Sequence, residues 1–254
     1  MKAPNFISVE EAKRLPGLRL VLAREVPGPW SVAARLIFDI KGIPYAAVAH
    51  IAGEANEDIR EWTGQASAPA AILDDERPRS GWSELLLLAE KIAPTPRLIP
   101  ADENERAQMF GLCYELCGED GFGWVARCLI FAAQQASGNV PYPSLIAKYA
   151  SGHEIDHYSK RMNDVVALLD RQLARQAAVG SPYLVGKMLS AADLYWTAFS
   201  NMIDGMSEAN CVMPDFFRQL GQLMSSYLDG PVPPALIRHR DFILDKYIDT
   251  PIRL

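Results

Sequence analysis

Along the first third of the chain, apolar runs and amphipathic stretches alternate. Short apolar runs, each bounded by turn-forming residues, predict strands at 20–23, 45–51 and 70–73. Helical patterns predict a helix at 30–41, a polar helix at 56–63 and a strongly apolar helix at 82–92. Strands that alternate with helices in this way indicate an α/β domain, which we place at residues 18–93.

A proline-rich stretch separates this region from the rest of the chain. Pro94, Pro96 and Pro100 are incompatible with a regular helix, so 94–100 is predicted to be a linker. After the linker the hydrophobic period is helical in segments at 102–119, 124–136, 154–178, 191–206, 214–228 and 234–247. We therefore expect a second, all-α helical bundle domain at residues 101–248.

Composition and charge narrow the classes of partner. The 254 residues are 49% hydrophobic and 22% charged, which is typical of a globular protein with room for two cores. A net charge of −6 without a cluster of Lys and Arg argues against nucleic acid and anionic membranes as partners. With no apolar stretch near ~20 residues and no signal-peptide pattern, we expect a cytoplasmic protein that binds small molecules.

The cysteines do not form a disulfide pattern. Cys113, Cys117, Cys128 and Cys211 are few and irregularly spaced, so we expect them to be reduced. Cys113 and Cys117 share a helix face, which favours buried apolar side chains over a redox or metal-binding pair.

The most specific local pattern lies in residues 182–199. Ser190 is a typical N-cap and Asp193 follows three residues later, so each side chain can satisfy a free N–H at a helix start. The residues that follow are apolar on all sides, which predicts a helix through a core. Because capping boxes are common, this pattern alone identifies a helix start and no family.

Together with other segments, this capping box resembles the C-terminal domain of the glutathione transferases. The further resemblance lies in Pro27–Leu36 with Lys41–Tyr45, in Ser67–Ala70 and in Gly81–Leu86. It implies a thioredoxin-like domain followed by an all-helical domain, glutathione as co-substrate, no metal, and a homodimer. The implied activity is transfer of the glutathione thiolate to a small hydrophobic electrophile.

The resemblance also suggests where glutathione binds. It places the cysteinyl part at Ala68 and Pro69, where a cis bond would turn the Ala68 main chain outward as a pairing edge. It places the γ-glutamyl carboxylate at Ser83, at the start of a helix. The family has an acidic residue immediately before this serine, whereas this sequence has Trp82. The alternatives are a trans proline in an ordinary loop and a serine that only caps its helix.

Activation of the thiol requires a donor aimed at sulfur. The family's activating position falls on Gly28, which has no side chain, and Trp30 stands where another class has its cysteine. The remaining candidate is the Ser31 hydroxyl, together with the main chain of Gly28 and Trp30. The alternative is that Ser31 is only a residue of the first helical turn.

For the electrophile, the expected wall is aromatic and lies at the start of the helical domain. It comprises Met109, Phe110, Tyr114, Phe122 and Trp124, all of which could equally be core residues. A second hypothesis is a non-catalytic binding or interaction protein of the same fold. Gly28 and Trp82, as lost glutathione contacts, favour that hypothesis.

One further motif suggests different chemistry. His153, Glu154 and His157 match the zinc-peptidase pattern of two histidines at i, i+4 with a glutamate as general base. Asp156 within the motif and Gly152 before it instead indicate a solvated helix start with acidic residues in its first turn. A zinc peptidase is therefore the remote alternative.

Overall fold

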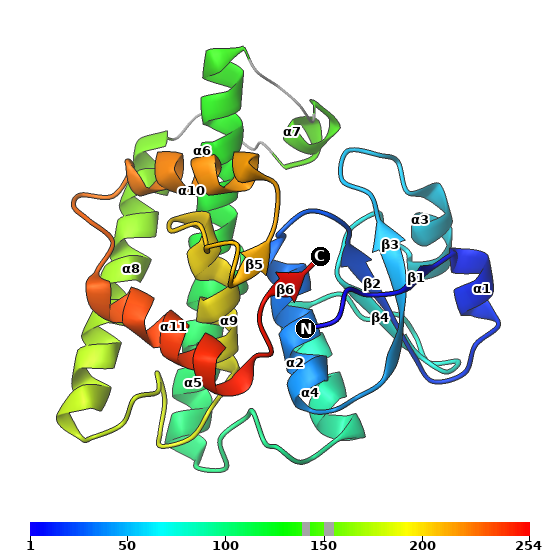
Figure 1. The fold of residues 1–254 in the computed structure, drawn as a ribbon, viewed down its shortest axis with the longest axis horizontal. Helices are drawn as coiled ribbons and strands as arrows, with labels where there is room; N and C mark the ends of the chain where they lie inside the picture. Colours follow the sequence, from blue (N-terminus) through cyan, green and yellow to red (C-terminus); the bar gives the residue numbers. More distant parts are fainter. Residues whose placement is uncertain (139–142, 150–154) are drawn as a thin grey trace.

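The computed structural model describes residues 1–138, 143–149 and 155–254. A small sheet with its helices forms one half of the molecule, and helices form the other half (Figure 1). The predicted fold class, a thioredoxin-like α/β domain followed by a helical bundle, is confirmed.

The sheet of the first half has the order β1-β3-β2-β4. Its strands are β1 (Phe6–Ile7), β2 (Leu18–Ala23), β3 (Tyr45–His50) and β4 (Ala70–Leu73). Strand β3 is parallel to both β1 and β2, whereas β4 is antiparallel to β2. Alternate residues of β2 point to opposite faces, so Leu20 and Leu22 join one core and Val21 joins another.

Helices cover both faces of this sheet. Those on the Leu20 face are α2 (Pro29–Ile40) and α4 (Trp82–Ile92), and those on the Val21 face are α1 (Val9–Lys13) and α3 (Glu57–Thr63). The elements β1 and α1 are very short and are not predicted from the sequence. A Ser8–Glu11 capping box, visible in the sequence, marks the start of α1.

The second half is built around α9, all of whose residues are buried. Its elements are α5 (Glu103–Cys117), α6 (Phe122–Ser137), α7 (Pro143–Tyr149), α8 (Ile155–Ala178), α9 (Ala191–Phe199), the 3₁₀ helix η1 (Ser200–Met202), α10 (Asp215–Ser225) and α11 (Pro234–Tyr247), with the short strands β5 (Cys211–Val212) and β6 (Ile252–Arg253). The predicted helix at 191–206 ends early as an α-helix. Asn201 Oδ1 accepts a hydrogen bond from Met206 N at 2.8 Å and turns the chain back.

The capping box at the start of α9 is confirmed, with one difference in its bonding. The Asp193 carboxylate accepts hydrogen bonds at 2.8 Å from Ser190 N, from Ser190 Oγ and from Leu184 N. The Ser190 hydroxyl therefore donates to Asp193 instead of accepting from the helix. The carboxylate ties the preceding loop to the buried helix.

The two halves meet along α2, which packs against α9. Trp30 Nε1, in the first turn of α2, donates to Cys117 O at the end of α5 over 3.1 Å. Tyr195 Oη of α9 donates to Trp82 O of α4 over 3.0 Å. The helical half of the molecule thus holds the first turns of α2 and α4 in place.

The cysteines behave as the sequence predicts. Each of the four is free and buried. Burial raises the pKa of the Cys113 and Cys117 thiols well above the ordinary value, because a thiolate is poorly solvated there. The interpretation of this pair as buried apolar side chains is confirmed.

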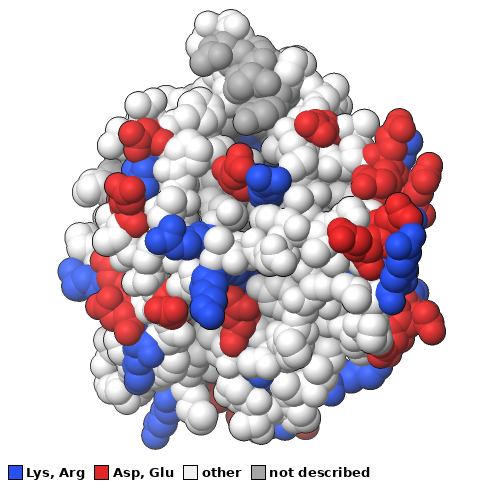
Figure 2. All heavy atoms as spheres, turned by 45° about the vertical axis from the view of Figure 1, so that its right-hand side comes forward, with Lys and Arg blue, Asp and Glu red and all other residues white. Residues whose placement is uncertain are grey.

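Charged side chains of both signs are interspersed on the face in Figure 2, and a broad uncharged area lies between them. Among the described residues, no helix is long and apolar enough to cross a membrane.

Candidate functional site

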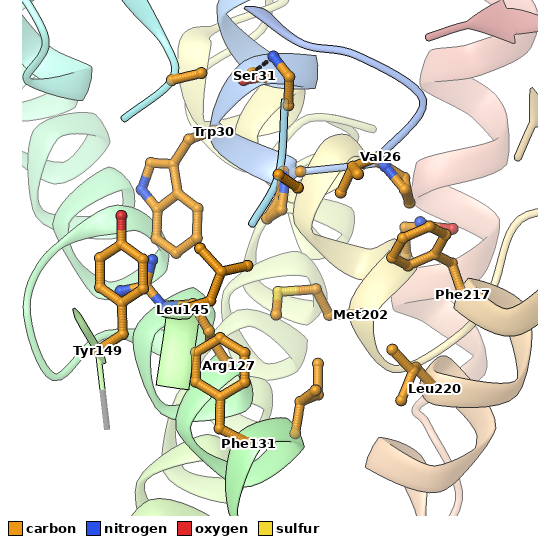
Figure 3. Close-up of a pocket in the computed structure, with 18 of the residues that line it drawn as sticks. Val26, Trp30, Ser31, Arg127, Phe131, Leu145, Tyr149, Met202, Phe217 and Leu220 are labelled. Atoms are coloured by element: carbon orange, nitrogen blue, oxygen red, sulfur yellow. Dashed lines mark hydrogen bonds between the residues drawn. The ribbon is translucent and has the colours of Figure 1, made fainter. Parts of the chain in front are cut away.

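A cavity of about 230 Å³ lies between the two halves of the molecule. The α/β half contributes residues from the β2–α2 loop, the first turn of α2 and the loop before β4. The helical half contributes residues of α6, α7, α10 and η1. Figure 3 shows Trp30 and Tyr149 at one side of the cavity and Met202, Phe217 and Leu220 at the other.

The start of α2 faces this cavity without a side-chain cap. Gly28 is the N-cap and Pro29 the first helical residue, so neither supplies a side-chain acceptor. The N–H groups of Trp30 and Ser31 lie in the first turn, where an α-helix offers no acceptor of its own. This end of the helix therefore presents main-chain donors and the positive end of the helix dipole to a ligand.

Ser31 lines the cavity but is only 4% exposed. Its Oγ accepts a hydrogen bond from Ala23 N at 3.1 Å, which connects α2 to the end of β2 (Figure 3). A hydroxyl that accepts in this way keeps its own proton to donate.

Ala68 also lines the cavity, and the Ala68–Pro69 bond is cis. In the described part of the chain, the Ala68 main chain makes no hydrogen bond. Its N–H and C=O are therefore available as a short pairing edge. The neighbouring Ser67 hydroxyl lies 2.9 Å from the Tyr149 hydroxyl, so α7 contacts this loop.

The opposite wall is largely apolar, but it is not the wall expected from the sequence. The residues expected at the start of the helical domain (Met109, Phe110, Tyr114, Phe122 and Trp124) do not line the cavity. Phe122 and Met109 are fully buried in the core, and Tyr114 is 53% exposed on the surface. The wall instead uses a later face of α6, with Arg127, Phe131 and Gln134 at helical spacing.

Arg127 is the charged group of that wall. Its guanidinium carbon lies 4.0 Å from the ring centroid of Tyr149, 4.5 Å from that of Trp124 and 5.0 Å from that of Trp30. Burial lowers the pKa of the Arg127 guanidinium, although arginine stays protonated at neutral pH. Arg127 is not among the residues predicted from the sequence, although it is the one charged residue in the apolar run Val125–Ala133.

Trp82 and Ser83 lie outside the lining of this cavity. The Trp82 ring packs edge-on against Tyr195, with centroids 5.7 Å apart. Ser83 is the second residue of α4, whose N-cap is Gly81. The Glu84 carboxylate accepts from Gly81 N at 3.1 Å and pairs with Arg77 at 2.8 Å, so this helix start already holds an anion of its own.

The histidine motif falls largely outside the described residues, since His153 and Glu154 are not among them. His157 lies in the first turn of α8, with Nε2 2.8 Å from Asp120 Oδ1. The described residues contain no group of three side chains that could hold a metal ion.

Neither a protein-family model nor a curated protein matches this sequence. Solved structures do match the fold. The β-etherase LigF of Sphingobium sp. strain SYK-6 has a TM-score of 0.65 and 20% identity, over 90% of this chain and 96% of that chain. A glutathione S-transferase of Methylobacillus flagellatus KT with glutathione bound has a TM-score of 0.65 and 13% identity, over 93% and 100%.

A third match is a glutathione S-transferase of Methylobacterium radiotolerans in complex with glutathione sulfonate. Its TM-score is 0.64 and its identity 16%, over 93% of this chain and 95% of that chain. These matches extend over both halves of the molecule. The chain therefore has the fold of the glutathione transferases.

Proposed function

We propose that this protein binds glutathione in the cavity and transfers its thiolate to a small hydrophobic electrophile. The observation that carries the proposal is the convergence of two features on one cavity wall. These are the uncapped first turn of α2 and the unpaired main-chain edge at Ala68. Solved structures of the same fold with glutathione or its sulfonate bound support the choice of ligand.

The cysteinyl and γ-glutamyl parts of glutathione then have chemically matched partners. The cysteinyl main chain pairs with Ala68, beside Pro69, and its sulfur lies near the first turn of α2. There the N–H groups of Trp30 and Ser31, the positive end of the helix dipole and the Ser31 hydroxyl stabilise a thiolate. The Gly28 main chain forms the floor of this sulfur site.

The γ-glutamyl end is a zwitterion and would extend beyond the cavity lining, toward the first turn of α4. Its carboxylate suits the N–H groups of Trp82 and Ser83 together with the Ser83 hydroxyl. Its ammonium suits the Glu84 carboxylate, whose pKa is lowered chiefly by the Arg77 hydrogen bond, so that it is charged at neutral pH. The apolar wall of the helical half then receives the electrophile, and binding both partners together lowers the entropic barrier to reaction.

The test is calorimetric titration of glutathione combined with ultraviolet titration of its bound thiolate. We expect a Kd in the micromolar to low millimolar range and a thiol pKa below the ordinary value of ~8.5. Ser83→Ala should weaken binding, whereas Ser80→Ala, in the preceding loop, serves as the matched control. Absence of glutathione binding by the folded protein would contradict the proposal.

A non-catalytic binding protein is the second candidate, and Gly28 favours it. No side chain occupies the position where the family resemblance expects an activating group. Glutathione that binds with an unshifted thiol pKa would support this candidate over the transferase. In either case we propose a cytoplasmic homodimer, which size-exclusion chromatography with light scattering would test.

A further inference from the structure

Arg127, which is half-buried, differs from the buried arginines of the protein in how its charge is compensated. Arg240 Nη1 lies 2.7 Å from Asp204 Oδ2, and Arg35 Nε lies 3.4 Å from Asp39 Oδ2. Arg19 donates to main-chain carbonyls of Leu15, Gly17 and Asp74. In the described part of the chain, Arg127 has neither a carboxylate nor a carbonyl partner.

Aromatic rings hold the Arg127 guanidinium in place. Trp30, Trp124 and Tyr149 surround it with ring centroids within 5.0 Å of its central carbon, and Figure 3 shows Arg127 beside Tyr149. Its Nε and Nη2 are shut off from solvent and, within the described ranges of the chain, have no hydrogen-bond partner. Cation–π contacts offset part of the cost of burying a charge, but they satisfy no N–H group.

The described lining of the cavity offers this cation no carboxylate as a counter-charge. Arg127 lines the cavity, and none of the described lining residues is an aspartate or a glutamate. Most of the other described lining residues are apolar, including Ile130, Phe131 and Met202. A positioned guanidinium in an apolar cavity is strongly attractive to an anion, because the low local dielectric strengthens the ion pair.

We infer that Arg127 binds a carboxylate of the second substrate, so that the electrophile is a compact hydrophobic acid. This inference rests on the proposed function, in which the same cavity receives the glutathione sulfur. The cavity of about 230 Å³ also receives the glutathione sulfur, so the space left for the second substrate is well below the ~300–1,000 Å³ typical of drug-sized ligands. A single unsaturated or aromatic unit with one carboxylate matches that size and polarity.

Two probes of the same shape test the inference: cinnamate, which carries the carboxylate, and cinnamamide, which is neutral. Binding is measured by calorimetry and by quenching of tryptophan fluorescence, without reference to turnover. The folded wild-type protein should bind cinnamate about ten-fold or more tightly than cinnamamide, as expected for a charge-assisted hydrogen bond in a cavity.

Variants of Arg127 then test whether its charge causes the preference for cinnamate over cinnamamide. Arg127→Met should bring the affinity ratio of the two probes close to one, whereas Arg127→Lys should keep much of it. Arg171→Met removes an exposed arginine of α8 and should leave the ratio unchanged. A purely structural role for Arg127 would weaken both probes alike and leave their ratio intact.

Equal binding of the two probes by the wild type, no binding of either, or an unchanged ratio in Arg127→Met would overturn the inference. A parallel glutathione titration identifies the source of the anion. If Arg127→Met weakens glutathione and the wild type does not prefer cinnamate, the arginine binds a carboxylate of glutathione and the inference fails. If cinnamate preference depends on Arg127 but glutathione does not bind, the proposed function fails and the carboxylate site stands.

Discussion

The starts of α9 and α2 face the same problem of free N–H groups and solve it in opposite ways. At α9, the fully buried Asp193 accepts three hydrogen bonds from the chain and lies 3.1 Å from His239 Nε2. At α2, Gly28 and Pro29 provide no cap, and the first turn opens onto the cavity. The closed helix start stabilises the fold, whereas the open one leaves its donors for a ligand.

The start of α4 is intermediate between these two. Glu84 caps it in the same way as Asp193 caps α9, but the Glu84 side chain is 37% exposed and its partner Arg77 lies on the surface. The three helix starts thus differ in their caps: α9 has a buried carboxylate, α4 an exposed one and α2 no side-chain cap. Changes at each start should therefore affect stability or ligand binding in different proportions.

The largest effect is expected from Asp193→Ala. Removal of the carboxylate leaves the buried N–H groups of Ser190 and Leu184 without acceptors, at a cost of about 3 kcal/mol in the free energy of unfolding. Asp193→Asn retains one acceptor oxygen and should cost less. Urea unfolding at neutral pH measures both, and a loss below about 1 kcal/mol for Asp193→Ala would show that α9 does not depend on this cap.

The second prediction concerns the contact that positions the open helix start. A Cβ on Gly123 of α6 would lie 2.2 Å from Phe199 Cε1 and 3.0 Å from Trp30 Cη2. Gly123→Ala should therefore cost about 1–3 kcal/mol in the free energy of unfolding and displace Trp30 from its place beside Arg127.

Gly111→Ala is the matched control for this substitution. Gly111 lies within α5, and its added Cβ would have no heavy atom within 4 Å. Because alanine is the better helix former, this variant should gain about 0.5–1 kcal/mol. Equal effects of the two substitutions, measured by urea unfolding, would show that the close approach at Gly123 is not required.

Most of the fold can be predicted from local sequence patterns. Alternating strands and helices, the prolines of the linker and the Ser190–Asp193 box each depend on residues close together in the chain. The shortest elements escaped for physical reasons: β1, β5 and β6 have two residues each, too few to show a period, and α1 and α7 have five and seven. The early end of α9 depends on the side chain of Asn201, which no helical period reveals.

The cavity was only half predictable from the sequence. Its α/β wall consists of short local segments, so Gly28, Trp30, Ser31 and Ala68 were named and do line it. Its helical wall is assembled from α6, α7, α10 and η1, and their relative placement is set by packing between distant residues. The contact of Tyr149 with Ser67, 82 residues away along the chain, has no local sequence signal.

The third prediction tests the open helix start directly with Gly28→Ser. A Cβ there would meet only Ala23 Cβ, at 3.7 Å, and the backbone has φ −61°, so the serine fits. Its hydroxyl can donate to the thiolate, in addition to the N–H groups of Trp30 and Ser31. If the site is a transferase site, kcat/KM should rise about ten-fold, which corresponds to about 1.4 kcal/mol, with only a few tenths gained in stability.

Gly28→Ala adds the same carbon without the hydroxyl and is the control. It should leave kcat/KM near the wild-type value in a glutathione conjugation assay with an aromatic electrophile. A rise in both variants would assign the effect to backbone restriction. No rise in Gly28→Ser would mean that the sulfur does not lie at the first turn of α2.

The smallest effect is expected at α4, where the cap is exposed and titrates. The hydrogen bond from Arg77 is the main cause of the lowered pKa of Glu84. A carboxyl whose pKa is lowered by folding stabilises the protein above its unfolded-state pKa, and this stabilisation is lost as the pH falls through the folded-state pKa. Glu84→Gln should therefore lower the free energy of unfolding by roughly 0.5 kcal/mol at pH ~7 and by almost nothing in acid. The effect is small because solvent screens this exposed ion pair. Urea unfolding of both proteins across this pH range measures the difference. A difference that persists in acid would mean that Glu84 acts through packing, and the differences among the three helix starts would then not follow from charge.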